Sequence, residues 1–326
     1  MRTVSTGLLV LLVALLFAPG TSNAQKGQGG ANDPFSTHEK ILQWVDGYRY
    51  DPAPARLPDA VKALSRLGLF RDPDAAGVFI GFMAGVLNSN PKNAERFVTR
   101  MFPMPPEDQG AIIKAIAYSG LPNWQGLMGK FVERMPARKS MIDSYLQGKA
   151  KVLHDLPLEE GPAPIDTLWG YYFATGSLEP VRRIISALKW ADDKADVTKL
   201  TVGSMAKWTL ANNATRDREL LYLLRDEQAL TSHPESVRAA LKEIVVAAET
   251  FETGKIRKEA LAAIEELKRK GPQLNNKWAT AASWGSTAIA VGCVVAGATG
   301  QVYLGIPCIL TGALSTAAVK MLNTSP

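Results

Sequence analysis

Apolar residues recur every three or four positions from residue 35 to about residue 270, and alternating runs of β-branched residues are nearly absent. This spacing places the apolar side chains on one face of an α-helix, whereas a strand would alternate them. Proline or glycine interrupts the pattern at intervals of about fifteen to nineteen residues. The pattern therefore predicts an all-α body made of short helices.

Helix starts can be assigned from prolines and from capping residues. Proline fits the first turn of a helix because the first amide hydrogens there have no carbonyl partner within the helix. The expected proline starts are Pro58, Pro73, Pro91, Pro106 and Pro122. The expected side-chain caps are Ser36 or Thr37, Ser177, Asp196, Thr215 and the capping box Ser232-His233-Pro234-Glu235, and Gly176 is expected to end the helix before Ser177.

Pairs of such helices would repeat with a period of about 30 to 35 residues, which resembles the spacing of α-solenoids such as HEAT and TPR repeats. The resemblance is confined to spacing, because the Trp, Gly, Tyr and Ala pattern of TPR repeats does not recur at a fixed period. A plain irregular helical bundle is the alternative. The expected architecture is an irregular, solenoid-like body of antiparallel helix pairs.

Changes in composition divide the chain into segments. Residues 154–164 combine three prolines and a glycine with ionisable groups, which excludes a regular helix. Residues 166–176 form the densest aromatic cluster, and their spacing favours a helix-hairpin core over a ligand groove. The predicted segments are a signal peptide (1–24), a flexible linker (25–34), a first helical subdomain (35–153), a Pro/Gly/acidic linker (154–164), a second helical subdomain (165–272) and an apolar helical hairpin (273–326).

The N-terminus has the features of a cleaved secretory signal peptide. Arg2 precedes an apolar run at residues 7–18, and small residues lead to a cut after Ala24. About a dozen apolar residues are too few to span a bilayer, which takes ~20. We therefore expect export to the periplasm or the extracellular space.

Charge and cysteine content limit the possible partners. The formal net charge of +6 is mild and, together with export, argues against a nucleic-acid partner while allowing contact with anionic surfaces. Only two cysteines occur in 326 residues. Packing rather than disulfides must therefore hold the body together, even in an oxidising compartment.

The tail contains two uncharged stretches, residues 278–299 and 302–319, and each is about long enough to cross a membrane. Gly300 and Gln301 form the natural turn of a helical hairpin between them. Small residues recur along one face and would let the two helices pack closely, as in a glycine zipper. The expected packing seam consists of Gly285, Gly292, Ala296, Gly300, Gly305 and Gly312.

Cys293 and Cys308 lie about equally far from this turn, so a disulfide across the hairpin is predicted. Four cations between residues 268 and 277 flank the hairpin. They conflict with simple insertion from outside, because positive flanks normally stay in the cytoplasm. Two alternatives to a transmembrane hairpin therefore remain: an apolar cap packed on the body, and an oligomeric pore or zipper.

No catalytic or cofactor motif is recognisable. Nucleotide-binding glycine loops, the Gly-x-Ser-x-Gly elbow and the His-Glu-x-x-His pair are absent from the sequence. A weak candidate for a cation site is one loop with four ligand-capable groups, although it lacks the spacing of an EF-hand. These groups are His154, Asp155, Glu159 and Glu160. Asn213-Ala214-Thr215 fits the N-glycosylation pattern but also suits a helix end and cap. We expect no cofactor and no metal.

The sequence thus favours an exported, non-catalytic scaffold or binding protein for a protein or peptide partner. Membrane lipid is the expected partner of residues 278–320, and homo-oligomers are possible. The alternative is a soluble exported all-α enzyme that acts on a cell-envelope polymer through carboxylates that the sequence does not assign. Binding is favoured because histidines are few and no nucleophile–base pair is evident.

Overall fold

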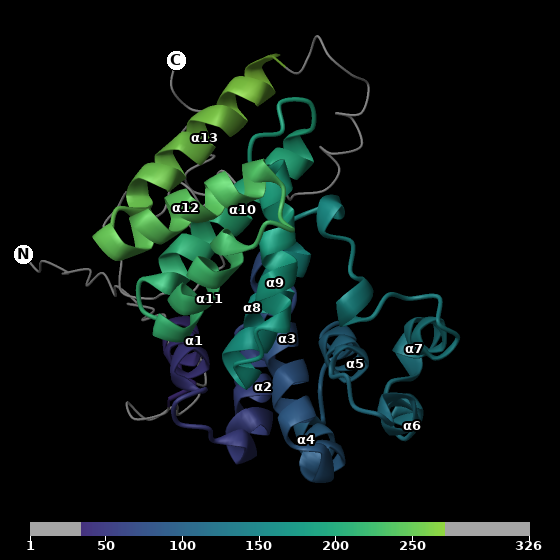
Figure 1. Cartoon of the computed structure of the whole chain (residues 1–326). Helices are drawn as coiled ribbons and strands as arrows, with labels where there is room; N and C mark the ends of the chain where they lie inside the picture. The colour runs from purple at the N-terminus through teal and green to yellow at the C-terminus, as the bar shows by residue number, and fades with distance from the viewer. Residues whose placement is uncertain (1–33, 271–326) are drawn as a thin grey trace, which may run out of the picture. The chain divides into compact units, whose positions relative to one another are not determined.

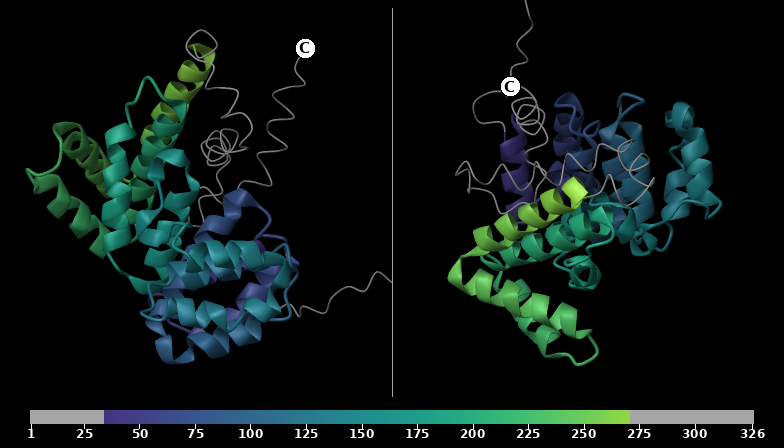
Figure 2. Two further views of the ribbon diagram at one scale, coloured as in Figure 1. Left: turned by 90° about the vertical axis from the view of Figure 1, so that its right-hand side faces the viewer. Right: turned by 90° about the horizontal axis from the view of Figure 1, so that it is seen from above.

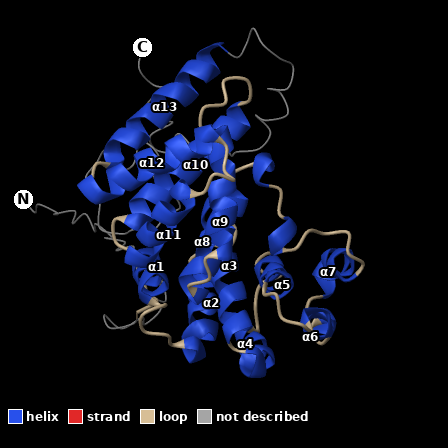
Figure 3. Cartoon of the chain, viewed as in Figure 1, coloured by secondary structure: helices blue, strands red, loops and turns tan. Residues whose placement is uncertain are grey.

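A computed structural model describes residues 34–270 of the 326-residue chain. All regular elements of this part are helices, and no strand occurs among residues 34–270 (Figure 3). The prediction of an all-α body is confirmed. The signal peptide, almost all of the linker and the apolar hairpin with Cys293, Cys308 and its glycine seam lie outside the described residues, so these stay predictions.

The helices follow one another with short connections, several of which contain a single 3-10 turn (Figure 1). Their bounds are α1 (His38–Gly47), α2 (Leu57–Arg66), α3 (Pro73–Ser89), α4 (Ala94–Met101), α5 (Gln109–Tyr118), α6 (Trp124–Gly129), α7 (Lys139–Leu146), α8 (Ala163–Thr175), α9 (Glu179–Ser186), α10 (Val197–Ala214), α11 (Arg218–Ala229), α12 (Glu235–Thr250) and α13 (Thr253–Lys270).

Several predicted helix ends are confirmed. Pro58 lies in the first turn of α2, and Pro73 begins α3. Thr37 caps α1 by accepting a hydrogen bond from the amide of Lys40 at 3.3 Å. Asp196 caps α10 by accepting from two backbone amides. Gly176 ends α8 with a φ of 68°, a left-handed conformation that glycine adopts without steric cost.

Three predicted caps are wrong. α9 begins at Glu179 without a side-chain cap, and the cap of α11 is Asp217 rather than Thr215. The expected capping box does not form either, since α12 begins at Glu235 after Pro234 and has no side-chain cap.

The side chain of His233 is engaged elsewhere. Its Nε2 lies 2.7 Å from a carboxylate oxygen of Glu227, and Arg182 donates to the other oxygen at 2.8 Å. Glu227 is buried, and an unpaired buried carboxylate would be costly. Burial acts to raise the pKa of Glu227, but its bonds to His233 and Arg182 outweigh burial and lower it. The His233 side chain therefore serves as a partner of a buried carboxylate and takes no part in capping α12.

The closest helix packing joins α3 and α8. Gly77, Gly81 and Gly85 follow one another at four-residue spacing, which places them on one face of α3. A Cβ atom on Gly81 would lie 1.8 Å from the carbonyl oxygen of Thr167, and one on Gly170 would lie 1.9 Å from that of Val78. Only glycine permits such an approach of two helix backbones.

Large side chains fill the space around this contact. Phe79 and Phe82 of α3 and Trp169 of α8 are fully buried and belong to one hydrophobic core. The indole Nε1 of Trp169 donates to the hydroxyl of Thr209 in α10 at 3.0 Å, which satisfies its polar atom inside the core. α3 and α8 come from the two different predicted subdomains, and that division stays a prediction.

The other helices pack mainly on close neighbours in the sequence. α10 contacts both α12 and α13, α11 contacts α12, and α5 contacts α6 and α7 (Figures 1 and 2). Among residues 34–270, no helix is both long and apolar enough to cross a membrane.

The glycine-faced contact makes a testable prediction. Gly81→Ala is expected to lower the free energy of unfolding by about 3 kcal/mol, because the new methyl group meets backbone that cannot rotate away. Gly110→Ala in α5 is the matched control, since its methyl would be 3.7 Å from the sulfur of Met141 and should stabilise the helix by roughly 0.5 kcal/mol. Urea unfolding measures both, and equal effects of the two variants would contradict the contact.

Candidate functional site

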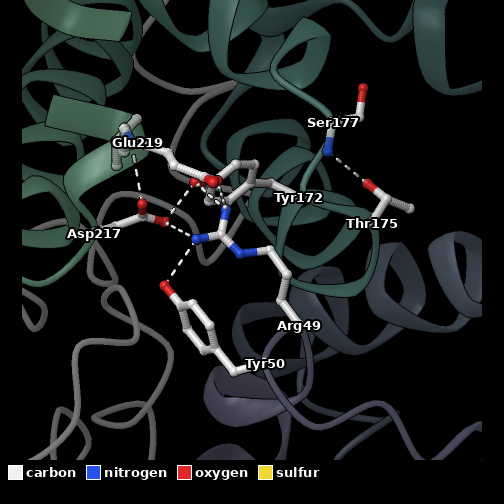
Figure 4. A network of polar contacts seen from close by, with 8 residues as sticks. Arg49, Tyr50, Tyr172, Thr175, Ser177, Asp217 and Glu219 are labelled. Carbon is white, nitrogen blue, oxygen red and sulfur yellow. Dashed lines mark hydrogen bonds and ion pairs between the residues drawn. The ribbon is translucent and has the colours of Figure 1, made fainter. Parts of the chain in front are cut away.

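A polar cluster forms where α1 ends beside α8 and α11 (Figure 4). Arg49, two residues beyond the end of α1, donates to the hydroxyls of Tyr172 and Tyr50, both at 2.7 Å. It also donates to the Oδ2 atom of Asp217 at 2.8 Å. One guanidinium group therefore ties together segments that are 123 and 168 residues apart in the chain.

Asp217 has two roles in this cluster. Its Oδ2 atom accepts from Arg49 and from the Tyr172 hydroxyl, whereas its Oδ1 atom accepts from the amide of Leu220 and so caps α11. Glu219 lies 3.5 Å from the guanidinium but is largely exposed. The start of α11 is thus fixed by the carboxylate that neutralises Arg49.

The electrostatics of the cluster favour one arrangement of protons. Burial raises the pKa of Tyr172, and the neighbouring Asp217 carboxylate raises it further, so the phenol stays protonated and acts as a donor. Burial opposes the charge of Arg49, but contacts with Tyr172, Tyr50 and Asp217 outweigh burial and raise its pKa. Arg49 is therefore a permanent cation held by a carboxylate and two phenols.

A small pocket of about 70 Å³ opens beside this cluster. It lies where the C-terminal ends of α1 and α10 meet α8 and the segment before α11. Its lining residues are Asp46, Arg49, Tyr50, Tyr172, Phe173, Asn213, Arg216 and Asp217. The pocket therefore combines polar groups of both charges with aromatic rings.

Two of the lining residues have unused hydrogen-bonding capacity. Asp46 makes no hydrogen bond and no ion pair within residues 34–270. Burial raises the pKa of Asp46, Arg216 opposes this shift, and Asp217 adds to it. Asn213 is only 5% exposed, and its buried Nδ2 atom has no hydrogen-bond partner in the described part of the chain. Most buried polar groups in proteins are bonded, so Asn213 is an exception, whereas the half-buried Asp46 is open to solvent at the pocket.

Some predicted residues contribute to this site. The aromatic cluster at 166–176 supplies core, as expected, because Trp169 is fully buried. The same cluster also supplies Tyr172 and Phe173 to the pocket. Asn213 is buried near the end of α10, whereas glycosylated asparagines lie in surface loops.

The loop proposed as a weak cation site does not contribute to the pocket. Nδ1 of His154 lies 3.4 Å from a carboxylate oxygen of Glu179 in α9. Glu179 is not one of the four groups of the proposed cation site. In the described part of the chain, no group of three histidine, cysteine or acidic side chains could hold a metal ion. None of the three histidines of the chain lines the pocket.

Sequence reasoning missed the residues that build the site. Asp46, Arg49 and Asp217 fit no motif, since their spacing in the chain has no regularity. A partial signal existed at Asp217, because aspartate is as good an N-cap as threonine and lies two residues after the expected cap. Nothing in the sequence indicated that this cap would also meet Arg49.

Comparison of the chain with protein-family models, with curated proteins and with solved structures finds no match in any of the three. The function therefore has to be argued from the chemistry of the site rather than from likeness.

Two substitutions of Asp217 separate its roles. Asp217→Asn keeps an oxygen for the amide of Leu220 but leaves Arg49 with only the exposed Glu219 as a counter-charge, and should lower the free energy of unfolding by about 2 kcal/mol. Asp217→Ala also removes the cap, and should cost about 1 kcal/mol more.

Glu249→Gln is the control, because Glu249 pairs with Arg225 at an exposed site where ion pairs contribute less than about 1 kcal/mol. Urea unfolding compares the three variants. If Asp217→Asn is no more destabilising than Glu249→Gln, the cluster does not anchor the three segments.

Proposed function

We propose that this protein is an exported helical scaffold that binds a protein or peptide partner, without evident catalysis. The observation that carries the proposal is the pocket beside Arg49, where Asp46 has no donor and the buried Nδ2 atom of Asn213 has no acceptor among residues 34–270. Among the lining residues, Tyr50 is 70% exposed. A half-open site with unpaired polar groups and an exposed tyrosine is typical of a surface that a partner completes.

The proposed body is an irregular helical repeat. Helix pairs that are close in sequence, such as α11 with α12 and α2 with α4, support this arrangement. The contact between α3 and α8 weighs against a simple solenoid, in which each unit touches only its neighbours. We therefore propose a repeat-like scaffold that is closed by one long-range helix contact.

Export and membrane attachment complete the proposal. The leader at 1–24 would direct export, and the uncharged stretch at 278–320 would associate with lipid. We further propose that this stretch is a hairpin with the glycine seam and the disulfide between Cys293 and Cys308. The two subdomains separated by residues 154–164, and self-association through the tail, belong to the same proposal.

A fractionation experiment tests the attachment. After alkaline carbonate washing, the full chain is expected to stay with the membranes, because most of residues 278–320 are apolar and uncharged. A chain that ends at Lys277 should move to the supernatant. Equal partitioning of the two chains would contradict attachment through the tail.

One observation bears on catalysis as the alternative. Burial raises the pKa of Asp46, which is the property of a carboxyl group that acts as an acid. Such chemistry on a cell-envelope polymer needs a second, free carboxylate nearby. Asp217 is engaged by Arg49, Tyr172 and the amide of Leu220, so it is a poor choice for that second group. Binding remains the better account of the site.

Site-specific crosslinking tests partner binding. A photoreactive phenylalanine derivative at position 50 should form a covalent adduct with a discrete protein or peptide in cells that export the chain, because Tyr50 lies at the pocket. The same substitution at Lys62, exposed on α2, is the control. No adduct at position 50, or identical adducts at both positions, would contradict the proposed function.

A further inference from the structure

Two neighbouring segments of the body carry an excess of exposed cations. Residues 91–101, which contain α4, and residues 124–134, which contain α6, hold five cations and two acids, and all seven side chains are exposed. Glu95 of α4 lies 2.5 Å from Lys130, directly after α6, so the two segments lie side by side (Figure 1). The five cations, which we call the basic surface, are Lys92, Arg96, Arg100, Lys130 and Arg134.

Only two cations of the basic surface are neutralised by a carboxylate. Lys130 pairs with Glu95, and Arg100 lies 3.7 Å from Asp59 of α2. The other three form no ion pair within residues 34–270, and Glu133 likewise pairs with no cation there. These three cations are Lys92, Arg96 and Arg134. The basic surface therefore retains three positive charges that the described fold does not use.

The stability of α4 does not explain these charges. Lys92 immediately precedes the helix and Arg96 lies in its first turn, where the positive end of the helix dipole disfavours a cation. Lys92, Arg96 and Arg100 also follow one another at four-residue spacing, and like charges at this spacing repel. The cations therefore weaken the helix that carries them, which favours a role in binding over that of an ordinary solvated face.

Aromatic rings hold two of the arginines in place. The guanidinium of Arg134 lies 5.8 Å from the ring centre of Phe102 and 5.6 Å from that of Phe131, and these two rings stack on each other. The guanidinium of Arg96 lies 5.9 Å from the ring centre of Phe97. Such contacts restrain a guanidinium without neutralising it. A restrained arginine loses less entropy when it forms paired hydrogen bonds with a carboxylate.

We propose that the basic surface binds an acidic segment of a polypeptide partner. Arg96 and Arg100 lie about 6 Å apart along the helix axis, since each residue rises 1.5 Å. Acidic side chains on alternate residues of an extended segment recur at a similar distance, about 7 Å. The planar guanidinium groups can each bind a carboxylate through two parallel hydrogen bonds. The basic surface shares no residue with the pocket beside Arg49, so this inference goes beyond the proposed function.

The surroundings of the basic surface do not suit a bilayer. A protein face that lies on a membrane combines cations with exposed apolar side chains that enter the lipid. No large exposed hydrophobic side chain belongs to residues 91–101 or 124–134. α4 and α6 also lie away from the last turn of α13, after which the tail begins (Figures 1 and 2). The expected export argues against nucleic acid, so an acidic polypeptide is the partner that fits.

The experiment measures binding of a fluorescent twelve-residue peptide, in which glutamate alternates with serine, to the full chain by fluorescence anisotropy. Combined substitution of the three unneutralised cations, Lys92→Gln, Arg96→Gln and Arg134→Gln, should weaken binding at least tenfold. The matched control combines Lys194→Gln, Lys242→Gln and Lys258→Gln, which remove the same charge from exposed positions outside the basic surface. This control should weaken binding less than twofold.

A single substitution separates binding from misfolding. Arg96→Gln relieves the repulsion within α4, so its thermal unfolding midpoint should stay unchanged or rise. The same variant should still weaken binding of the peptide at least threefold, because it removes one of the guanidinium groups that pair with a carboxylate.

Loss of binding that is confined to the basic-surface variants supports the inference. It is overturned if the peptide does not bind the original chain, or if the control variant weakens binding as much as the triple variant. It is also overturned if heparin or vesicles of phosphatidylglycerol bind through the three cations more tightly than the peptide does. Crosslinking at position 50 tests the proposed function separately, so either result can fail without the other.

Discussion

The contact between α3 and α8 is the constraint on which the described structure depends. Two helix backbones meet there without intervening side chains, because Gly81 and Gly170 each lie against a carbonyl oxygen of the other helix. Such close packing leaves no freedom for either helix to shift without steric overlap. Because Gly81 and Gly170 have no Cβ atom, α8 can lie directly against α3. This contact sets the position of α8 and hence of the aromatic residues on its other faces.

The candidate site is built outward from α8. Tyr172 reaches from the core to Arg49 and Asp217, so a single phenol connects the packed interior to the end of α1 and the start of α11. Fully bonded polar clusters of this kind fix geometry. Against that fixed background, the carboxylate of Asp46 has no bonded partner among residues 34–270, and it is the group that we propose is open to a partner.

Local features of the fold could be predicted from the sequence, and distant contacts could not. The all-α class follows from the spacing of apolar residues. Several helix ends follow from Thr37, Asp196 and Gly176, because a capping residue interacts only with backbone a few positions away. The polar cluster beside the pocket joins Arg49 to residues 123 and 168 positions further along the chain. Local periodicity carries no information about contacts at such separations. Close packing through small residues was expected in the tail, yet Gly81 and its neighbours in α3 carry the same spacing and were not singled out.

Native-state hydrogen exchange of the full chain tests the central role of the α3–α8 contact most directly. The amides of α3 and α8 should be the slowest to exchange and should share one opening free energy, equal to that of global unfolding, because neither helix can leave its glycine-faced partner alone. If α8 instead exchanges at a much lower free energy than α3, the contact does not organise the fold, and the site built on α8 loses its support.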